Sequence, residues 1–240
     1  TEIKEYAFTE TGVAAVFLPK LTKICDFAFD NCKFKQLDAE TFPNLTTITK
    51  GGFCECKITS VDLPNLRQIG FRTFSGCPIE LLNAPNLASI GQEAFMEARF
   101  TAVQLPSLTS IATFGFMDCR VLEFVGAPKL QKVASGCFSG CSKLSAIDCK
   151  LEAKKFKCVE CDDSLCPVCS KTIVECLKRG QLPEQIEKAR IMQQQMLADL
   201  KSQQKQVAGL LQIDKQDKLV EKKETKTVRI RVRKMWQNFD

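Results

Sequence analysis

The chain has 240 residues, of which 45% are hydrophobic and 26% are charged, a balance that is ordinary for a folded protein with a sizeable core. Histidine is absent, which removes the usual general base near neutral pH, so the composition argues against an enzyme. The net charge of +6 belongs to the C-terminal part, because residues 1–150 carry 15 basic and 15 acidic side chains.

Residues 6–149 consist of a repeat of about 21 residues. Leucine recurs two residues after each repeat proline, isoleucine or valine five residues after it, and phenylalanine ten residues after it. One turn cannot bury its own apolar side, whereas stacked turns share a continuous core, so the pattern predicts a solenoid. The prolines are Pro19, Pro43, Pro64, Pro85, Pro106 and Pro128, and the phenylalanines are Phe29, Phe53, Phe74, Phe95, Phe116 and Phe138.

Cysteine recurs three residues after the repeat phenylalanine, with Ala98 as the one exception. Stacked turns place equivalent residues above one another at about 4.8 Å, so these cysteines are expected to form an interior ladder. The replacement of one rung by Ala98 argues against obligatory disulfide pairing and favours structural thiols. The five thiols are Cys32, Cys56, Cys77, Cys119 and Cys141.

A second apolar pair follows each phenylalanine, and the positions between and beside its members are expected to face outward. Leu81, Leu122 and Val125 are apolar at such positions, where other turns carry lysine, threonine or aspartate. We interpret these three residues as a partner-binding patch. The alternative is that they are isolated exposed apolar residues, which are common on protein surfaces. The pairs are Phe34/Leu37, Ile58/Val61, Ile79/Leu82, Phe100/Val103, Val121/Phe124 and, after one inserted residue, Leu144/Ile147.

The motif Pro-x-Leu-x-x-Ile-x(4)-Phe-x-x-Cys, followed by a second Leu-x-x-Ile-like segment, resembles the BspA-like leucine-rich-repeat family. The resemblance covers about residues 6–149 and implies a right-handed leucine-rich-repeat β-solenoid built from short strands. It also implies a binding role, often surface adhesion, although the same repeats occur inside cells. Fold transfers well within such a family, whereas partner and compartment do not.

Two Cys-x-x-Cys pairs follow the repeat, at Cys158, Cys161, Cys166 and Cys169. Four thiolates on two tight turns suit tetrahedral Zn²⁺, so we predict a structural zinc site. Two disulfides in an extracellular module are the first alternative, and Cys149 and Cys176 would then join the framework. A redox turn at Cys166-Pro-Val-Cys169 is the second, but no thioredoxin-like βαβ pattern surrounds it.

The sequence after the cysteine cluster predicts a helix and then a basic end. Apolar residues recur with a period near 3.5, which is typical of a weak coiled coil that self-associates; the alternative is a helix docked on its own solenoid, or a linker. The segment Val228–Arg233 alternates apolar residues with arginine. Such a strand would contact phosphates or an acidic protein through Arg229, Arg231, Arg233 and Lys234, and a solvated basic tail is the alternative.

The sequence therefore predicts four regions. These are a solenoid over 1–149, a Cys-rich zinc knuckle over 150–180, an amphipathic helical segment over 181–224 and a basic strand or tail over 225–240. Together they suggest a cytoplasmic, non-catalytic scaffold that binds protein partners or joins a larger assembly, with no membrane span. A cell-surface or secreted adhesion antigen with a disulfide-bonded cluster is the first alternative. Binding of nucleic acid or a ribonucleoprotein through the tail is the second.

Overall fold

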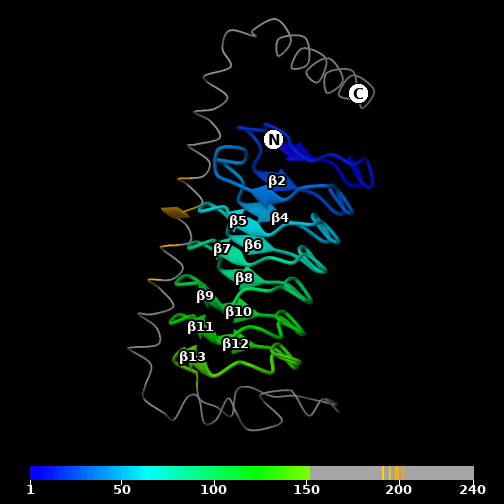
Figure 1. Ribbon diagram of the computed structural model, residues 1–240. Coiled ribbons are helices and arrows are strands. Elements are labelled where there is room, and N and C mark those ends of the chain that lie inside the picture. The colour runs from blue at the N-terminus through cyan, green and yellow to red at the C-terminus, as the bar shows by residue number, and fades with distance from the viewer. Residues whose placement is uncertain (152–190, 192–194, 196–197, 200–201, 203–240) are drawn as a thin grey trace, which may run out of the picture. The chain divides into compact units, whose positions relative to one another are not determined.

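The computed structural model describes residues 1–151, 191, 195, 198–199 and 202. The chain divides into two compact units, residues 1–194 and residues 195–240. Within residues 1–151 the backbone coils into stacked turns, and the strands follow one another in chain order from β1 to β13 (Figure 1).

The strands of this stack form one long parallel sheet and two short ones. The long sheet contains β1 (Glu2–Ile3), β2 (Lys23–Ile24), β4 (Thr47–Ile48), β6 (Gln68–Ile69), β8 (Ser89–Ile90), β10 (Ser110–Ile111) and β12 (Lys132–Val133). One short sheet contains β3 (Gln36–Leu37), β5 (Ser60–Asp62) and β7 (Leu81–Asn83), and the other contains β9 (Ala102–Gln104), β11 (Phe124–Gly126) and β13 (Ala146–Asp148).

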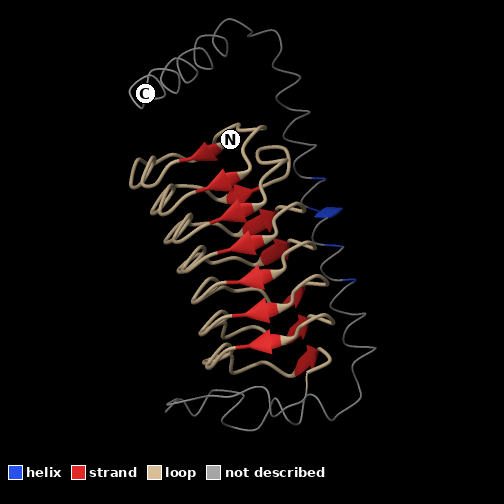
Figure 2. Cartoon of the chain, turned by 180° about the vertical axis from the view of Figure 1, so that it is seen from behind, coloured by secondary structure: helices blue, strands red, loops and turns tan. Residues whose placement is uncertain are grey.

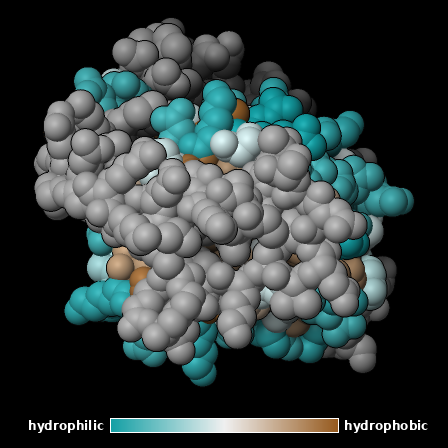
Figure 3. Space-filling model, turned by 90° about the horizontal axis from the view of Figure 1, so that it is seen from below, coloured by the Kyte–Doolittle hydropathy of each residue, from teal (hydrophilic) through white to brown (hydrophobic). Residues whose placement is uncertain are grey.

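The register of the long sheet repeats from turn to turn, so that Ile24, Ile48, Ile69 and Ile90 lie directly above one another. Figure 2 shows these strands in a single column, with loops extending from one end of each strand. Around the stack, most of the visible surface of the described residues is hydrophilic (Figure 3). The parallel-strand β-solenoid predicted from the repeat is confirmed.

The repeat phenylalanines form a stacked column through the core. Neighbouring rings from Phe8 to Phe138 lie 5.1 to 5.9 Å apart between centroids, with their planes within 20° of parallel. Every ring of the column except Phe8 is fully buried. Each such pair contributes about 0.5–1.5 kcal/mol beyond the burial of its apolar area, so the column ties each turn to the next.

The cysteine ladder is also buried, and its thiols bond to the backbone. The Sγ atoms of Cys56, Cys77 and Cys119 donate to the carbonyl oxygen of the repeat phenylalanine one turn earlier, at 3.1, 3.0 and 3.2 Å. Cys32 and Cys141 make the equivalent bond at 2.9 and 3.0 Å. These cysteines are free thiols, as the sequence predicted.

Two corner positions in each turn have a left-handed backbone. They lie eight and twelve residues after each repeat proline, and most of them are not glycine. Phe27 (φ 52°) and Gly51 (φ 61°) occupy the first of these positions in consecutive turns. A Cβ atom on Gly51 would lie 2.3 Å from the Phe27 ring, so glycine there leaves the space that the ring occupies.

Beyond residue 151, five residues are described: Ile191, Gln195, Ala198, Asp199 and Ser202. All five are helical and exposed. They fall within the predicted helical segment 181–224, and the other residues of that segment lie outside the described part of the chain. Nearly all of the predicted knuckle and the whole basic tail also lie outside it. In the portion that the structure describes, no helix is long and apolar enough to cross a membrane.

Candidate functional site

Aromatic and cationic side chains line one corner of the first four turns, just after strands β1, β2, β4 and β6. We name Tyr6, Phe27, Lys50, Phe71 and Arg72 the aromatic corner. Tyr6 stacks on Phe27 with ring centroids 5.4 Å apart and planes 15° from parallel. The side of the stack is open to solvent, because Tyr6 is 60% exposed.

The two cations of the aromatic corner rest against its rings. The Lys50 ammonium lies 5.2 Å from the Phe27 centroid and 5.7 Å from the Phe71 centroid, so it sits between two rings. The Arg72 guanidinium lies 5.0 Å from the Phe71 centroid and also pairs with Glu93 at 2.5 Å. Each exposed cation–π contact contributes about 0.5–1 kcal/mol, which favours one arrangement of these long side chains.

The backbone of the aromatic corner is held in an uncommon conformation. Tyr6, Phe27 and Arg72 have φ of 55°, 52° and 52°, in the left-handed region that bulky residues seldom adopt. A non-glycine residue there costs about 1–2 kcal/mol. Large side chains thus project from positions where glycine would be easier to accommodate.

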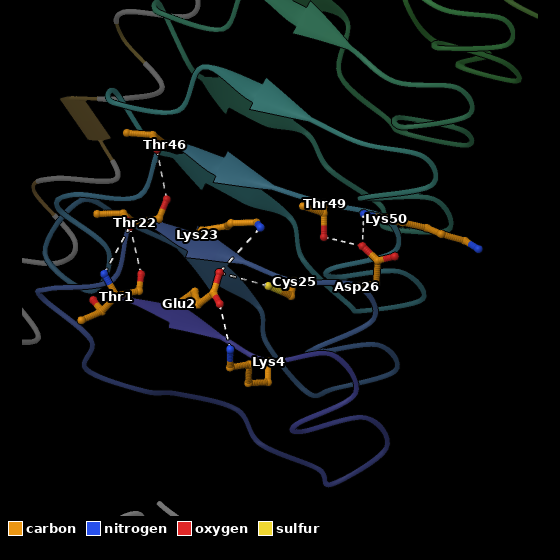
Figure 4. Close-up of polar contacts among 10 residues, drawn as sticks. All are labelled: Thr1, Glu2, Lys4, Thr22, Lys23, Cys25, Asp26, Thr46, Thr49 and Lys50. Atoms are coloured by element: carbon orange, nitrogen blue, oxygen red, sulfur yellow. Dashed lines mark hydrogen bonds and ion pairs between the residues drawn. The ribbon is translucent and has the colours of Figure 1, made fainter. Parts of the chain in front are cut away.

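A carboxylate, Asp26, bonds to the loop of the next turn (Figure 4). Asp26 accepts a hydrogen bond from the Thr49 hydroxyl at 2.5 Å and another from the Lys50 backbone N–H at 3.2 Å. These bonds join the second and third turns directly next to Phe27 and Lys50. The hydrogen bond to Asp26 therefore holds the Lys50 backbone in place independently of the Lys50 side chain.

A separate polar cluster covers the N-terminal edge of the long sheet (Figure 4). Glu2 pairs with Lys4 at 2.9 Å and with Lys23 at 3.6 Å. The hydrogen bond from Lys4 and then the two positive charges lower the pKa of the Glu2 carboxyl. The Glu2–Lys23 pair thus links the side chains of the neighbouring strands β1 and β2.

The structure corrects the expected outward placement of Leu122 and Val125. Both side chains lie in the core and are 0% exposed. One residue is inserted after Cys119, as in the following turn, so the inward pair becomes Leu122/Val125 and Phe124 moves to the outward side. Leu81 does lie on the outward side of β7, but it is only 8% exposed. The three residues do not form an exposed patch.

The other predicted site residues cannot be placed. Cys158, Cys161, Cys166 and Cys169 lie outside the described residues, and so do Arg229, Arg231, Arg233 and Lys234. Among the residues that the structure does describe, no cluster of ligating side chains suits a metal ion. The zinc site and the basic contact surface stay predictions.

The aromatic corner was not predicted from the sequence. Its signal was an aromatic residue at a polar loop position in three of the first four turns, at Tyr6, Phe27 and Phe71. Phe71, however, stands one place earlier in its repeat than Phe27 does, and Lys50 shares the position of Phe71. Only the stacked structure shows that Lys50 lies between the two rings.

Two solved structures are similar to part of this chain. A leucine-rich cell surface protein from Faecalibacterium prausnitzii is 21% identical with a TM-score of 0.46, over 64% of this chain and 44% of its own. The pneumococcal vaccine antigen PcpA is 17% identical with a TM-score of 0.29, over 61% of this chain and 55% of its own. The chain thus spans roughly half of each solved chain. No curated protein matches it.

A family model extends over most of the chain. The BspA type leucine-rich-repeat region matches residues 1–78 and 67–159, with six copies of the repeat. The matched residues include all thirteen strands described above and every rung of the phenylalanine and cysteine ladders. The chain belongs to the BspA-type leucine-rich-repeat family.

Proposed function

We propose that this protein is a non-catalytic module that binds a protein partner through the aromatic corner. The observation that carries the proposal is the exposed arrangement in which Lys50 lies between Phe27 and Phe71, beside the Tyr6 stack. Tyrosine and arginine are enriched among the residues that dominate protein interfaces. Rings and cations that are already ordered lose less conformational entropy on binding, which favours affinity.

We propose a location at the cell surface in place of the cytoplasmic location that we expected. Surface adhesion is the role that resemblance to this family implies, and the family match supports this alternative better than an intracellular scaffold. The test is differential thiol labelling of protein taken directly from intact cells. Surface exposure predicts that an impermeant reagent labels accessible cysteines of the protein on intact cells, with the buried Cys56 and Cys77 labelled only after denaturation. Protection of the whole protein until the cells are lysed would contradict this location.

The test of the aromatic corner begins with identification of the partner by cross-linking in the native source and mass spectrometry. Affinity for that partner is then measured for Lys50→Glu and for Lys132→Glu, a matched charge reversal at an exposed position of β12. We expect Kd to rise at least about tenfold for Lys50→Glu, which corresponds to about 1.4 kcal/mol, and to change little for Lys132→Glu. Equal effects of the two variants would exclude the corner as the binding site.

The four-cysteine cluster is proposed to hold one structural Zn²⁺. Deprotonated thiolates at Cys158, Cys161, Cys166 and Cys169 supply the donor set that zinc prefers. Elemental analysis of protein purified under reducing conditions should find one zinc per chain, and Cys161→Ser with Cys166→Ser should remove it. Protein from the native source with no zinc and with these cysteines oxidised would favour the disulfide alternative. The remaining alternative, a thiol oxidoreductase, predicts turnover that Cys166→Ser abolishes, and we expect none.

A further inference from the structure

The outward side of the two short sheets changes character along the stack. In register, the outward position is Gln36 in β3 and Ser60 in β5, and both are polar. From β7 onward the equivalent positions are apolar. We name these residues the outer strip: Leu81, Ala102, Phe124 and Ala146.

Three members of the outer strip are buried although they face away from the core, and the fourth, Ala102, is partly buried. Side chains alternate between the two faces of a strand, and the inward neighbours Leu82, Val125 and Ile147 belong to the main core. Phe124 and Ala146 are nevertheless only 4% and 3% exposed. They form a small cluster with Ala102 that is separate from the main core. The strip is therefore a covered apolar surface.

The chain itself supplies a suitable cover close by. Strand β13 carries Ala146 and ends at Asp148, so the described part of the chain reaches Leu151 only five residues after the last member of the outer strip. A tethered segment reaches its site at an effective concentration of the order of mM, well above that of most separate partners. The 29 residues that separate Leu151 from Gln181 extend far enough to reach any part of the strip, at about 3.3 Å per residue.

We propose that residues 183–191 form an amphipathic helix that docks on the outer strip, with Pro183 at its first position. Ile186 and Ala189 share one helix face, and Leu182, directly before Pro183, extends this apolar side at the helix start. Ile191 lies on the opposite face of such a helix, and it is helical and 49% exposed. The exposed residue is thus on the side that should remain in solvent.

The dimensions agree with this assignment. Four consecutive turns contribute the outer strip, and three steps of about 4.8 Å between turns give a length of about 14 Å. The nine residues of the proposed α-helix, at about 1.5 Å each, also extend about 14 Å. One short helix with its apolar face on the strip therefore covers Leu81 through Ala146.

The test is photo-cross-linking in the full-length chain. Benzoylphenylalanine in place of Phe124 should cross-link to the tryptic peptide 180–188, which contains Leu182 and Ile186. The same group in place of Ser60 is the control and should not. In a mixture of light and isotopically heavy chains, the products should be only light–light or heavy–heavy. Light–heavy products would show that a second copy of the chain covers the strip, which would overturn the proposal. Cross-links from position 124 to another peptide only, or no cross-link from position 124, would also overturn it.

A second pair of variants separates docking from a folding defect. Leu182→Asp with Ile186→Asp changes the proposed buried face, whereas Ile191→Asp changes the exposed face of the same segment. We expect the cross-linking yield from position 124 to fall at least tenfold in the first variant and to stay unchanged in the second. Equal yields would contradict the docked helix. Because the aromatic corner shares no residue with the outer strip, this result is independent of the proposed partner binding.

Discussion

Ala98 interrupts a hydrogen-bonding pattern that is regular elsewhere in the ladder. The Phe53 carbonyl accepts the Cys56 backbone N–H at 3.4 Å and the Cys77 thiol at 3.0 Å. The Phe74 carbonyl likewise accepts the Cys77 backbone N–H at 3.1 Å. The next ladder position, from which a cysteine thiol would donate to the same carbonyl, is occupied by Ala98, which has no thiol. This one rung therefore lacks a bond that its neighbours make.

We predict that Ala98→Cys raises the free energy of unfolding by about 0.5–1 kcal/mol, the usual net contribution of one intramolecular hydrogen bond. Urea unfolding under reducing conditions measures the change. Ala98→Ser is a useful control, because its hydroxyl is smaller and more costly to desolvate. A destabilised Ala98→Cys variant would mean that the core there is too tightly packed to admit sulfur.

The buried thiols should also make stability depend on alkaline pH. Burial raises the pKa of the Cys56 thiol to about 12, and burial with the Asp30 charge raises that of Cys54 to about 11. The unfolded chain ionises its thiols near about 8.5, so stability is fully present below that pH and is lost as pH rises toward the folded values.

We predict a loss of about 1 kcal/mol per pH unit for each such thiol between about pH 8.5 and 10. Chemical unfolding at several pH values in this window, with reductant present, gives the slope. Cys56→Ala should have a shallower slope than the unchanged chain. An identical slope would show that other groups cause the dependence.

At the scale of a single turn, the inserted residue after Cys119 decides which side chains face inward. A one-residue shift exchanges the two faces of a strand, so Leu122 and Val125, expected to face outward, lie in the core. The interval of 22 residues between Pro106 and Pro128 contained the signal, but it does not say where in the turn the extra residue lies. The place of the extra residue within the turn depends on which strand register buries more apolar surface. In the structure, the register is the one that buries Leu122 and Val125.

We predict that Leu122→Ala costs about 2–5 kcal/mol, because it leaves a cavity in the main core. The matched variant Val121→Ala, at the half-buried neighbouring position, should cost less than about 1 kcal/mol. Thermal or urea unfolding compares the two. Equal costs would contradict the register described for this turn.

The corner formed by Phe27 and Gly51 shows how consecutive turns constrain one another. The ring of one turn occupies the volume that a side chain of the next would need. We predict that Gly51→Ala destabilises the protein by at least about 1 kcal/mol, through strain at its positive φ and contact with the ring. In a Phe27→Ala background the same substitution should cost less, and a double-mutant cycle measures the difference. If the cycle shows no coupling, the whole destabilisation by Gly51→Ala comes from backbone strain and none from contact with the Phe27 ring.

At the scale of the molecule, the repeat spacing was sufficient to predict the solenoid, its phenylalanine column and its thiol ladder. These follow from chemistry that is identical in every turn. The aromatic corner and the outer strip were not predicted, because each depends on how unlike residues from different turns meet, as Lys50 meets Phe27 and Phe71. The left-handed corners were also hidden, since residues such as Glu97 occupy them in place of glycine.

The two surfaces that interrupt the repeat overlap only in the fourth turn, which gives the module a direction. Tyr6, Phe27, Lys50 and Phe71 come from the first four turns, whereas the outer strip runs from β7 to β13, in the fourth to seventh turns. An extra turn inserted after the fourth would move Phe124 about 4.8 Å farther from Tyr6 and leave the aromatic corner unchanged. Because the middle turns interlock only with their neighbours, the number of repeats can act as a molecular spacer that is adjustable in fixed increments.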